Sequence, residues 1–381
     1  MFQNRKAFRK IQYKYIHVLI GYTLLNMICL IIYMNDQTSY DNRLNGLQDT
    51  KDKKQHKNVF FLKLHKTASS TIQNIFFRYV DSNDLNMALP KEGGTTFNYS
   101  HMFSREFVQP SVKPFNVICH HLRYHKNVLG IMPADTKSIT IIRNPDTQFV
   151  SSFNYFNFKN CFKGIKTIEE FARVLPKIKK EGSCAKINPQ NSMLYDFGLP
   201  FTSITNITAI KDKIIEVDKT FDLVILSEYI DEGLILMREL LGWTNKDIIY
   251  LNKLVNSRPK ETISTETQDN LREYNKGDVL LYEHFNKTFW QKAKHFGIQK
   301  LKTEVENFRK LRQKWYNFCI EATLPGDQIK DIDFKADYND DKVLAYNMNE
   351  NAKETELCYQ LITQELQYSM YFNARLQKYW S

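Results

Sequence analysis

The chain has 381 residues, of which 43% are hydrophobic and 13% aromatic, and it carries a formal net charge of +11. This length and apolar content allow one large α/β domain or two small ones and exclude an intrinsically disordered protein. Five basic residues and no acidic residue lie within the first fifteen positions, so the rest carries about +6 (11 − 5), which suits an anionic ligand or an acidic membrane surface. Because no basic block is interleaved with aromatic residues, we expect no nucleic-acid partner.

The N-terminal part of the chain has the pattern of a membrane anchor. Residues 16–34 contain no Asp, Glu, Lys or Arg, and a helix of this length, at ~1.5 Å per residue, just crosses the hydrocarbon core of a bilayer. The basic flank precedes this segment, so the positive-inside rule predicts a cytoplasmic tail at 1–15, a transmembrane signal anchor at 16–34 and a luminal bulk. A cleaved signal peptide is the alternative, but the apolar segment is long for one and no small-residue cleavage site follows it.

The part that follows the anchor has features of a luminal protein. Residues 35–57 are polar and charged and predict a solvated stem, after which a folded luminal domain occupies residues 58–381. Glycosylation of N-x-S/T sequons requires entry into the endoplasmic reticulum. Three such sequons occur, at Asn98, Asn206 and Asn286.

Four of the six cysteines fall in polar or helical stretches of the expected luminal part. We expect them to form two disulfides, Cys161–Cys184 and Cys319–Cys358, as is common in an oxidising compartment. Connectivity cannot be deduced from sequence, and four free thiols remain the alternative.

Apolar runs of strand length alternate with amphipathic helices between residues 58 and 300. The expected strands are at 59–64, 115–119, 138–142 and 222–227, and the expected helices include 71–79 and 232–241. This order predicts an α/β domain with a mainly parallel sheet flanked by helices, and such sheets bind ligands at the carboxyl ends of their strands. From about residue 301 the composition predicts a helical C-terminal extension, with helices over 301–321 and 350–379.

A basic residue and several hydroxyl residues connect the first expected strand to the first expected helix. The segment runs Lys66-Thr67-Ala68-Ser69-Ser70-Thr71. Backbone N–H groups at a helix N-terminus, with hydroxyls and a cation, form a site for phosphate or sulfate. The Walker pattern G-x-x-x-x-G-K-[ST] is absent, which disfavours an ordinary P-loop ATPase. A Ser/Thr-rich helix cap beside a solvated lysine is the alternative.

Two further groups follow expected strands. Arg143 ends one strand and Ser151 lies two helical turns later, so both could line one end of an extended anionic ligand, although a surface arginine near a helix start is the alternative. His120 and His121 follow another strand, and a histidine there could act as a general base. Adjacent residues of a strand face opposite ways, so at most one of the two faces the cleft. Zinc binding is disfavoured because no HExxH or CxxC companion exists, and a buried structural histidine is the alternative.

Taken together and in this order, these segments resemble the Golgi galactose 3-O-sulfotransferases, which include galactosylceramide sulfotransferase, and are more distantly similar to uronyl 2-O-sulfotransferases. The resemblance covers about residues 58–300 and rests on the motifs FLKLHKTASST, CHHLRY, MPADTKSITIIRNP, DLVILSEYIDEGLILMRELLGW and LYEHFNKTFW. It implies a P-loop-like sulfotransferase fold on a single-pass type II Golgi membrane protein. It also implies 3′-phosphoadenosine 5′-phosphosulfate (PAPS) as sulfate donor, with no metal.

The resemblance also implies residue roles. Lys66 is similar in position to the family's catalytic lysine, and His121 aligns with the catalytic base of related 2-O-sulfotransferases. The cradle of the 5′-phosphosulfate would consist of Lys66, Thr67, Ala68, Ser69, Ser70 and Thr71. Arg143 and Ser151 match the residues of the 3′-phosphate site. Candidates for the acceptor pocket are His120, Arg123 and Glu228, with a structural role for Glu228 as the alternative.

The implied acceptor is a galactose 3-hydroxyl on a glycolipid or a glycoprotein glycan. One rival is a type II glycosyltransferase that binds manganese through Asp331-Ile332-Asp333, although this tripeptide lies away from the expected sheet. A second rival is an inactive, membrane-tethered carbohydrate-binding protein. The sequence leaves open whether the chain forms a homodimer.

Overall fold

The computed structural model describes residues 26–27, 54–158, 162, 164–175, 189–253, 255–256, 262–329, 331, 334–335 and 343–377. The chain divides into two compact units, residues 1–50 and 51–381. The expected tail, most of the expected anchor and most of the expected stem lie outside the described residues. Within the ranges given above, no helix is long and apolar enough to cross a membrane.

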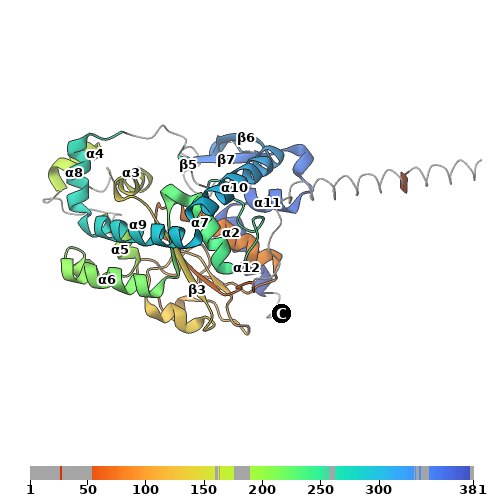
Figure 1. The fold of residues 1–381 in the computed structure, drawn as a ribbon, viewed down its shortest axis with the longest axis horizontal. Coiled ribbons are helices and arrows are strands. Elements are labelled where there is room, and N and C mark those ends of the chain that lie inside the picture. The colour runs from red at the N-terminus through yellow and green to blue at the C-terminus, as the bar shows by residue number, and fades with distance from the viewer. Residues whose placement is uncertain are drawn as a thin grey trace, which may run out of the picture. The chain divides into compact units, whose positions relative to one another are not determined.

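A parallel sheet of four strands forms the centre of the second unit (Figure 1). Its strands lie in the order β2-β1-β3-β4, with bounds β1 (Val59–Leu62), β2 (Val117–Ile118), β3 (Lys137–Ile142) and β4 (Leu223–Leu226). All the residues of β1, β2 and β4 are buried, and so are all those of β3 after Lys137. Burial on both faces explains why the sequence shows continuous apolar runs here in place of alternation. All four expected strands are confirmed, although β1, β2 and β4 are shorter than expected.

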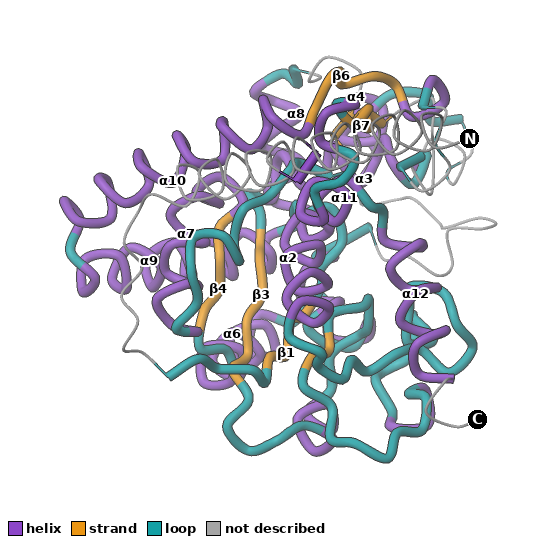
Figure 2. The backbone as a smooth tube through the Cα atoms, turned by 90° about the vertical axis from the view of Figure 1, so that its right-hand side faces the viewer, coloured by secondary structure: helices purple, strands orange, loops and turns teal. Residues whose placement is uncertain are grey.

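Helices surround the sheet, and Figure 2 shows α2 running beside β1 and β3, with α6, α7 and α9 near β4. The helices are α2 (Ser69–Ser82), α3 (Pro145–Tyr155), α4 (Ile168–Val174), α5 (Ser192–Asp196), α6 (Ile207–Thr220), α7 (Ile230–Leu241), α8 (Thr265–Tyr274), α9 (Lys276–Phe296), α10 (Ile298–Cys319), α11 (Glu356–Ile362) and α12 (Glu365–Gln377). Local chemistry sets the boundaries. Asn144 accepts a hydrogen bond from the backbone of Asp146 at the start of α3, where Pro145 fixes a helical φ.

The end of α7 shows how a glycine fixes a helix boundary. Gly242 follows the helix with φ of 65°, and its backbone N–H bonds the Arg238 carbonyl. A Cβ at this position would lie 2.7 Å from the carbonyl oxygen of Lys54, too close for any other side chain. The helix therefore ends where the chain segment that leads into β1 passes over it.

A second sheet, which the sequence analysis did not predict, joins two strands of the C-terminal extension to one strand that precedes it. β5 (Val255–Asn256), β7 (Val343–Met348) and β6 (Ile320–Pro325) form an antiparallel sheet in that order. The helix expected over 301–321 is confirmed as the main part of α10, whereas the expected helix over 350–379 is wrong in its continuity. It divides into a 3₁₀ turn at Glu350–Ala352, α11 and α12, because Thr363 ends α11 in an extended conformation with ψ of 135°.

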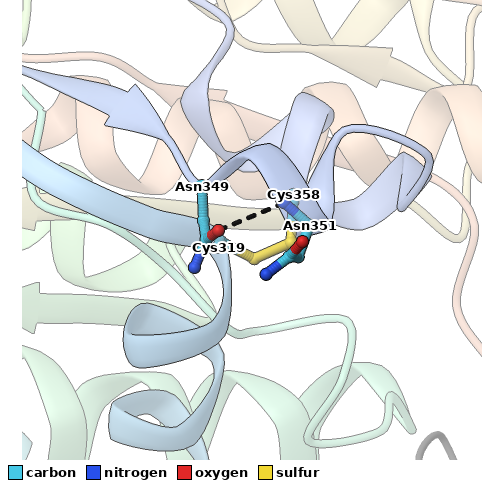
Figure 3. Close-up of a disulfide and its surroundings, with 4 residues drawn as sticks. All are labelled: Cys319, Asn349, Asn351 and Cys358. Atoms are coloured by element: carbon cyan, nitrogen blue, oxygen red, sulfur yellow. Dashed lines mark hydrogen bonds between the residues drawn. A yellow bond between two sulfur atoms is a disulfide. The ribbon is translucent and has the colours of Figure 1, made fainter.

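A disulfide connects helices α10 and α11 of the extension. Cys319, the last residue of α10, bonds Cys358 in α11, as the sequence analysis expected (Figure 3). The backbone N–H of Asn349 also donates to the Cys319 carbonyl at 2.8 Å, so β7 is bound to the same corner. The second expected pair, Cys161–Cys184, lies outside the described residues.

The three sequon asparagines occupy different environments. Asn98 is exposed in a loop and Asn206 is exposed at the start of α6, where its side-chain oxygen accepts a hydrogen bond from the Ala209 N–H at 3.1 Å. Asn286 is half-buried within α9. A glycan would be attached to the side-chain nitrogen of Asn206, so the side-chain oxygen would have to keep the capping hydrogen bond.

Candidate active site

The turn between β1 and α2 has an uncommon backbone conformation. Lys66 and Ala68 have φ of 60° and 67°, in the left-handed region that residues other than glycine rarely adopt. Alternation between left- and right-handed conformations directs successive N–H groups into a concavity that binds anions. The turn leads into the N-terminus of α2, which has no acidic residue in its first turn and no side-chain cap from Ala68. The helix dipole therefore adds to the positive potential.

The hydroxyl residues of this turn stabilise its shape. The side chains of Thr67 and Ser69 both donate to the Leu64 carbonyl, at 3.2 and 2.6 Å. The Thr71 hydroxyl accepts from the backbone N–H of Lys253 at 3.0 Å. These three residues are buried, whereas Ser70 is half-buried. Their side chains therefore hold the turn closed and leave the backbone N–H groups for an anion.

Lys66 is surrounded by positive charge. Its pKa is lowered from 10.5 to about 8 by burial, followed by repulsion from Arg143 and Lys63. We call Lys63, Lys66 and Arg143 the cationic group. The Lys66 ammonium lies 3.6 Å from the ring centroid of Tyr155. A buried cation beside two other cations gains most from an anionic ligand, because that ligand supplies the missing opposite charge.

Arg143 brings the end of β3 to the same place. One of its terminal nitrogens donates to the Lys66 carbonyl at 3.3 Å, and its Nε donates to the Thr147 hydroxyl at 2.9 Å. Burial lowers the pKa of Arg143, and Glu228 opposes this shift. Ser151 lies two helical turns later in α3, half-buried. The structure therefore places Arg143 against the turn from which Lys66 extends.

His121 faces the same turn from the loop after β2. Its Nδ1 lies 3.0 Å from the Lys63 carbonyl, which fixes Nδ1 as the donor and leaves Nε2 as an acceptor. Burial, and next the nearby His65, lower the pKa of His121 well below 6.5. The imidazole is therefore neutral at physiological pH, the form in which it can accept a proton.

His65 stacks on His121 and is oriented by a buried carboxylate. The two rings lie 4.2 Å apart at an angle of 10°. His65 Nδ1 lies 2.9 Å from an oxygen of Asp196, which also accepts the His65 backbone N–H at 2.9 Å. The Tyr99 hydroxyl donates to the other Asp196 oxygen at 2.5 Å. A carboxylate in this position fixes the tautomer with Nε2 as acceptor and stabilises the imidazolium that forms on proton uptake. We call His65, Tyr99, His121 and Asp196 the histidine group.

His120 points the other way, as the alternation along a strand predicts. It is fully buried, with Nδ1 3.3 Å from the Gln73 side-chain amide and Nε2 3.0 Å from the Ser369 hydroxyl of α12. Burial lowers its pKa to about 4. One helical turn before Ser369, Glu365 forms an ion pair with Lys63, whose side chain is only 1% exposed. Helix α12 therefore binds both Lys63, which precedes the β1–α2 turn, and His120, in the loop after β2.

The two remaining acceptor candidates bind groups of the protein itself. Arg123 donates to the carbonyls of Tyr195 at 3.1 Å and Leu199 at 2.8 Å, with its guanidinium 3.9 Å from the Tyr195 ring centroid. Glu228 accepts from the Asn144 N–H at 2.8 Å and from the Tyr282 hydroxyl at 3.1 Å. Both contacts stabilise loops at the carboxyl ends of the strands. Contact of Arg123 or Glu228 with an acceptor stays a prediction.

Comparison with known proteins decides the family. The galactose-3-O-sulfotransferase family model matches residues 1–376. Similar proteins include human galactose-3-O-sulfotransferase 2, 33% identical over 328 residues (82% of this chain, 81% of that protein). Mouse galactosylceramide sulfotransferase is 32% identical over 337 residues (84% and 79%), and mouse galactose-3-O-sulfotransferase 3 is 32% identical over 375 residues (92% and 86%). This chain belongs to the galactose-3-O-sulfotransferase family.

As a galactose-3-O-sulfotransferase the protein is an enzyme, and this overturns both rival interpretations. Of the tripeptide proposed for manganese in the glycosyltransferase alternative, only Asp331 is described. Within the described part of the chain, no group of three or more His, Cys, Asp or Glu side chains could hold a metal ion.

Sequence reasoning missed three residues of the histidine group in this sulfotransferase, His65, Tyr99 and Asp196. His65 stands beside Lys66 in a segment already singled out, so its position at a strand end was a usable signal. Asp196 lies 131 positions away in the short helix α5, within no motif. Only the folded chain brings it to His65.

Proposed function

We propose that this sulfotransferase transfers a sulfuryl group from PAPS to the 3-hydroxyl of galactose on a glycolipid or a glycoprotein glycan. The names of its relatives support galactose as the acceptor sugar. The observation that carries the donor assignment is the cationic group beside the N-terminus of α2, where Lys66 and Arg143 lie against a backbone concavity. This arrangement suits a ligand with two separate anionic groups, such as PAPS.

The geometry of the turn and the family resemblance together support a set of residues for the donor. The backbone N–H groups of residues 67–70 and the Lys66 ammonium would bind the 5′-phosphosulfate. Arg143, with Ser151 from α3, would bind the 3′-phosphate, and a guanidinium suits such a phosphate because it donates two parallel hydrogen bonds. When bound, PAPS supplies an activated sulfuryl group on a good leaving phosphate.

Transfer needs a base for the sugar hydroxyl and a cation for the leaving group. As the hydroxyl proton moves to a histidine Nε2, the sugar oxygen forms a bond to sulfur and the bond from sulfur to the bridging phosphate oxygen breaks. Lys66 stabilises the negative charge that develops on that phosphate. Positioning and electrostatic stabilisation supply most of the catalysis in such group transfers.

The histidine group offers two candidates for the base. His121 is the residue that the family resemblance implies, and its Nε2 is free to accept a proton. His65 also offers Nε2, and the Asp196 carboxylate stabilises its charged form, which His121 lacks. We therefore assign proton uptake to His65, with His121 stacked against it as the residue that fixes its ring plane.

The deciding experiment measures transfer of labelled sulfate from PAPS by the full-length enzyme in detergent, with chelator present. The acceptor panel includes galactosylceramide, a galactose-terminated oligosaccharide and the matching 3-deoxygalactose compounds. Transfer to a galactoside but not to its 3-deoxy analogue supports the proposal and shows which acceptor class is preferred. If the wild-type enzyme neither transfers sulfate nor binds PAPS, the proposed function is wrong.

We also propose that the enzyme is a single-pass type II protein of the Golgi membrane with its catalytic domain in the lumen. The uncharged segment 16–34, its basic flank and the three sequons support this orientation. Protease treatment of sealed Golgi vesicles should leave the catalytic domain intact and remove only a tag placed before residue 1. Cleavage of the domain in sealed vesicles would contradict this orientation.

A further inference from the structure

Tyr155 lies where the cationic group meets helix α3. It is the last residue of α3, and its ring centroid is 3.6 Å from the Lys66 ammonium. The same helix begins just after Arg143 and carries Ser151. One helix therefore presents an aromatic face to the proposed catalytic lysine and carries the serine that is proposed for the 3′-phosphate site.

The charges around Lys66 explain why an aromatic face matters there. The charged groups that act on its ammonium are Arg143, at the end of β3, and Lys63, at the end of β1, and both repel it. Glu228 acts on Arg143 rather than on Lys66. The face of a tyrosine ring carries negative electron density and attracts a cation, most strongly where water is excluded. Tyr155 therefore offsets part of the repulsion that the donor's anion removes on binding.

We propose that Tyr155 is a positioning residue whose ring face holds the Lys66 ammonium beside the β1–α2 turn while the donor site is empty. The proposal rests on the role of Lys66 in the proposed function. Tyr155 itself touches no reacting atom. It keeps the lysine charged and extended, so that the donor meets a preformed cation rather than a side chain that must first be ordered.

The test compares Tyr155→Leu, which removes the ring, with Tyr155→Phe, which keeps the ring and removes only the hydroxyl. Without the ring, Lys66 should lose its proton more easily. The alkaline limb of kcat/KM should then move to lower pH by roughly one unit, so that kcat/KM falls roughly twofold at pH 7 and roughly tenfold at pH 9. Tyr155→Phe should keep both the wild-type limb and the wild-type rate, because the ring face is unchanged.

A second measurement reads Lys66 directly and needs no turnover. Titration of ¹³C-dimethylated Lys66 by NMR, assigned with Lys66→Arg, should show the same displacement in Tyr155→Leu and none in Tyr155→Phe. Tyr155→Met, which is also ring-free, replaces Tyr155→Leu if that variant fails to fold. Equal titration in the ring-free variant and the wild type overturns the proposal, as does a Tyr155→Phe enzyme that behaves like Tyr155→Leu. Failure of the proposed function is a separate outcome. In that case the wild-type enzyme would transfer no sulfate, whatever pH dependence the titration of Lys66 shows.

Discussion

The cationic group and the histidine group meet at the same turn and are built in opposite ways. In the cationic group Lys63 is already paired with Glu365, whereas Lys66 is repelled by both Arg143 and Lys63 and gains most from an anionic ligand. The histidine group is satisfied internally, because Asp196 accepts hydrogen bonds from both His65 and Tyr99. The contrast indicates that the first group is organised to bind an anion and the second to hold a neutral sugar hydroxyl near a prepared base.

Substitutions in the histidine group test this contrast most strongly, because they have the largest expected effect. His65→Ala should lower kcat by about 10²- to 10⁴-fold, the usual cost of losing a general base, while PAPS affinity stays unchanged. Asp196→Asn should give a loss of similar order, because the amide no longer stabilises the imidazolium. His121→Ala should cost less than His65→Ala, since it keeps the Asp196-supported base.

Single-turnover rates and calorimetric PAPS titrations measure these effects separately. If His121→Ala lowers kcat more than His65→Ala does, the general base is His121 and not His65. Weakened PAPS binding in His65→Ala would mean that the two groups are not independent.

Within the cationic group, Lys66→Ala should lower kcat by about 10²- to 10³-fold, the usual range for one electrostatic donor to the transition state. The wild-type enzyme should also lose activity as pH rises through about 8, because the catalytic form of Lys66 is the charged one and its pKa lies at about 8. The kcat/KM profile reports the free enzyme and is the measurement to make. Lys66→Arg is the control, since an arginine stays charged and should abolish this limb; a limb that persists in Lys66→Arg would belong to another residue.

Arg143 should affect binding more than chemistry. Arg143→Ala removes charge-assisted hydrogen bonding worth ~1.5–3 kcal/mol in total, so PAPS affinity should fall roughly 10- to 100-fold. Arg143→Lys keeps the charge without the planar fork and should recover part of the affinity. Competition by adenosine 5′-phosphosulfate, which lacks the 3′-phosphate, should be affected little by either variant. Equal losses for both nucleotides would show that Arg143 acts on the turn instead.

The smallest effect concerns the support of the histidine group. Asp278, buried in α9, accepts the backbone N–H groups of Met193 at 3.0 Å and Leu194 at 2.9 Å, which open the short helix that ends at Asp196. Burial raises the pKa of Asp278 from 3.8 to about 7. Because the folded state holds this proton more tightly than the unfolded state, the contribution of Asp278 to stability is complete below pH 4 and is lost as pH rises toward 7. Urea unfolding of the wild type and of Asp278→Asn across this range should show a pH-dependent difference of a few kcal/mol; parallel curves would contradict it.

Sequence analysis predicted the features that depend on residues close together in the chain. A strand buried on both faces, such as Val59–Leu62, must be apolar throughout, and the turn that follows it carries its charge and hydroxyls in consecutive positions. Asp196 gives no such signal, because a single carboxylate in a five-residue helix has meaning only beside His65. Strands β6 and β7 were missed because their pairing across the intervening segment, rather than their composition, determines them.

Helix α12 has a consequence for biosynthesis. The strands of the parallel sheet and the turn proposed to bind the anion are all made before residue 227, yet the partner of the buried Lys63 is Glu365. An unpaired charge at that depth is strongly destabilising. A nascent chain that has completed β4 therefore still lacks the support behind its catalytic turn, and a product that stops before Glu365 would be an unfinished enzyme rather than a shortened one.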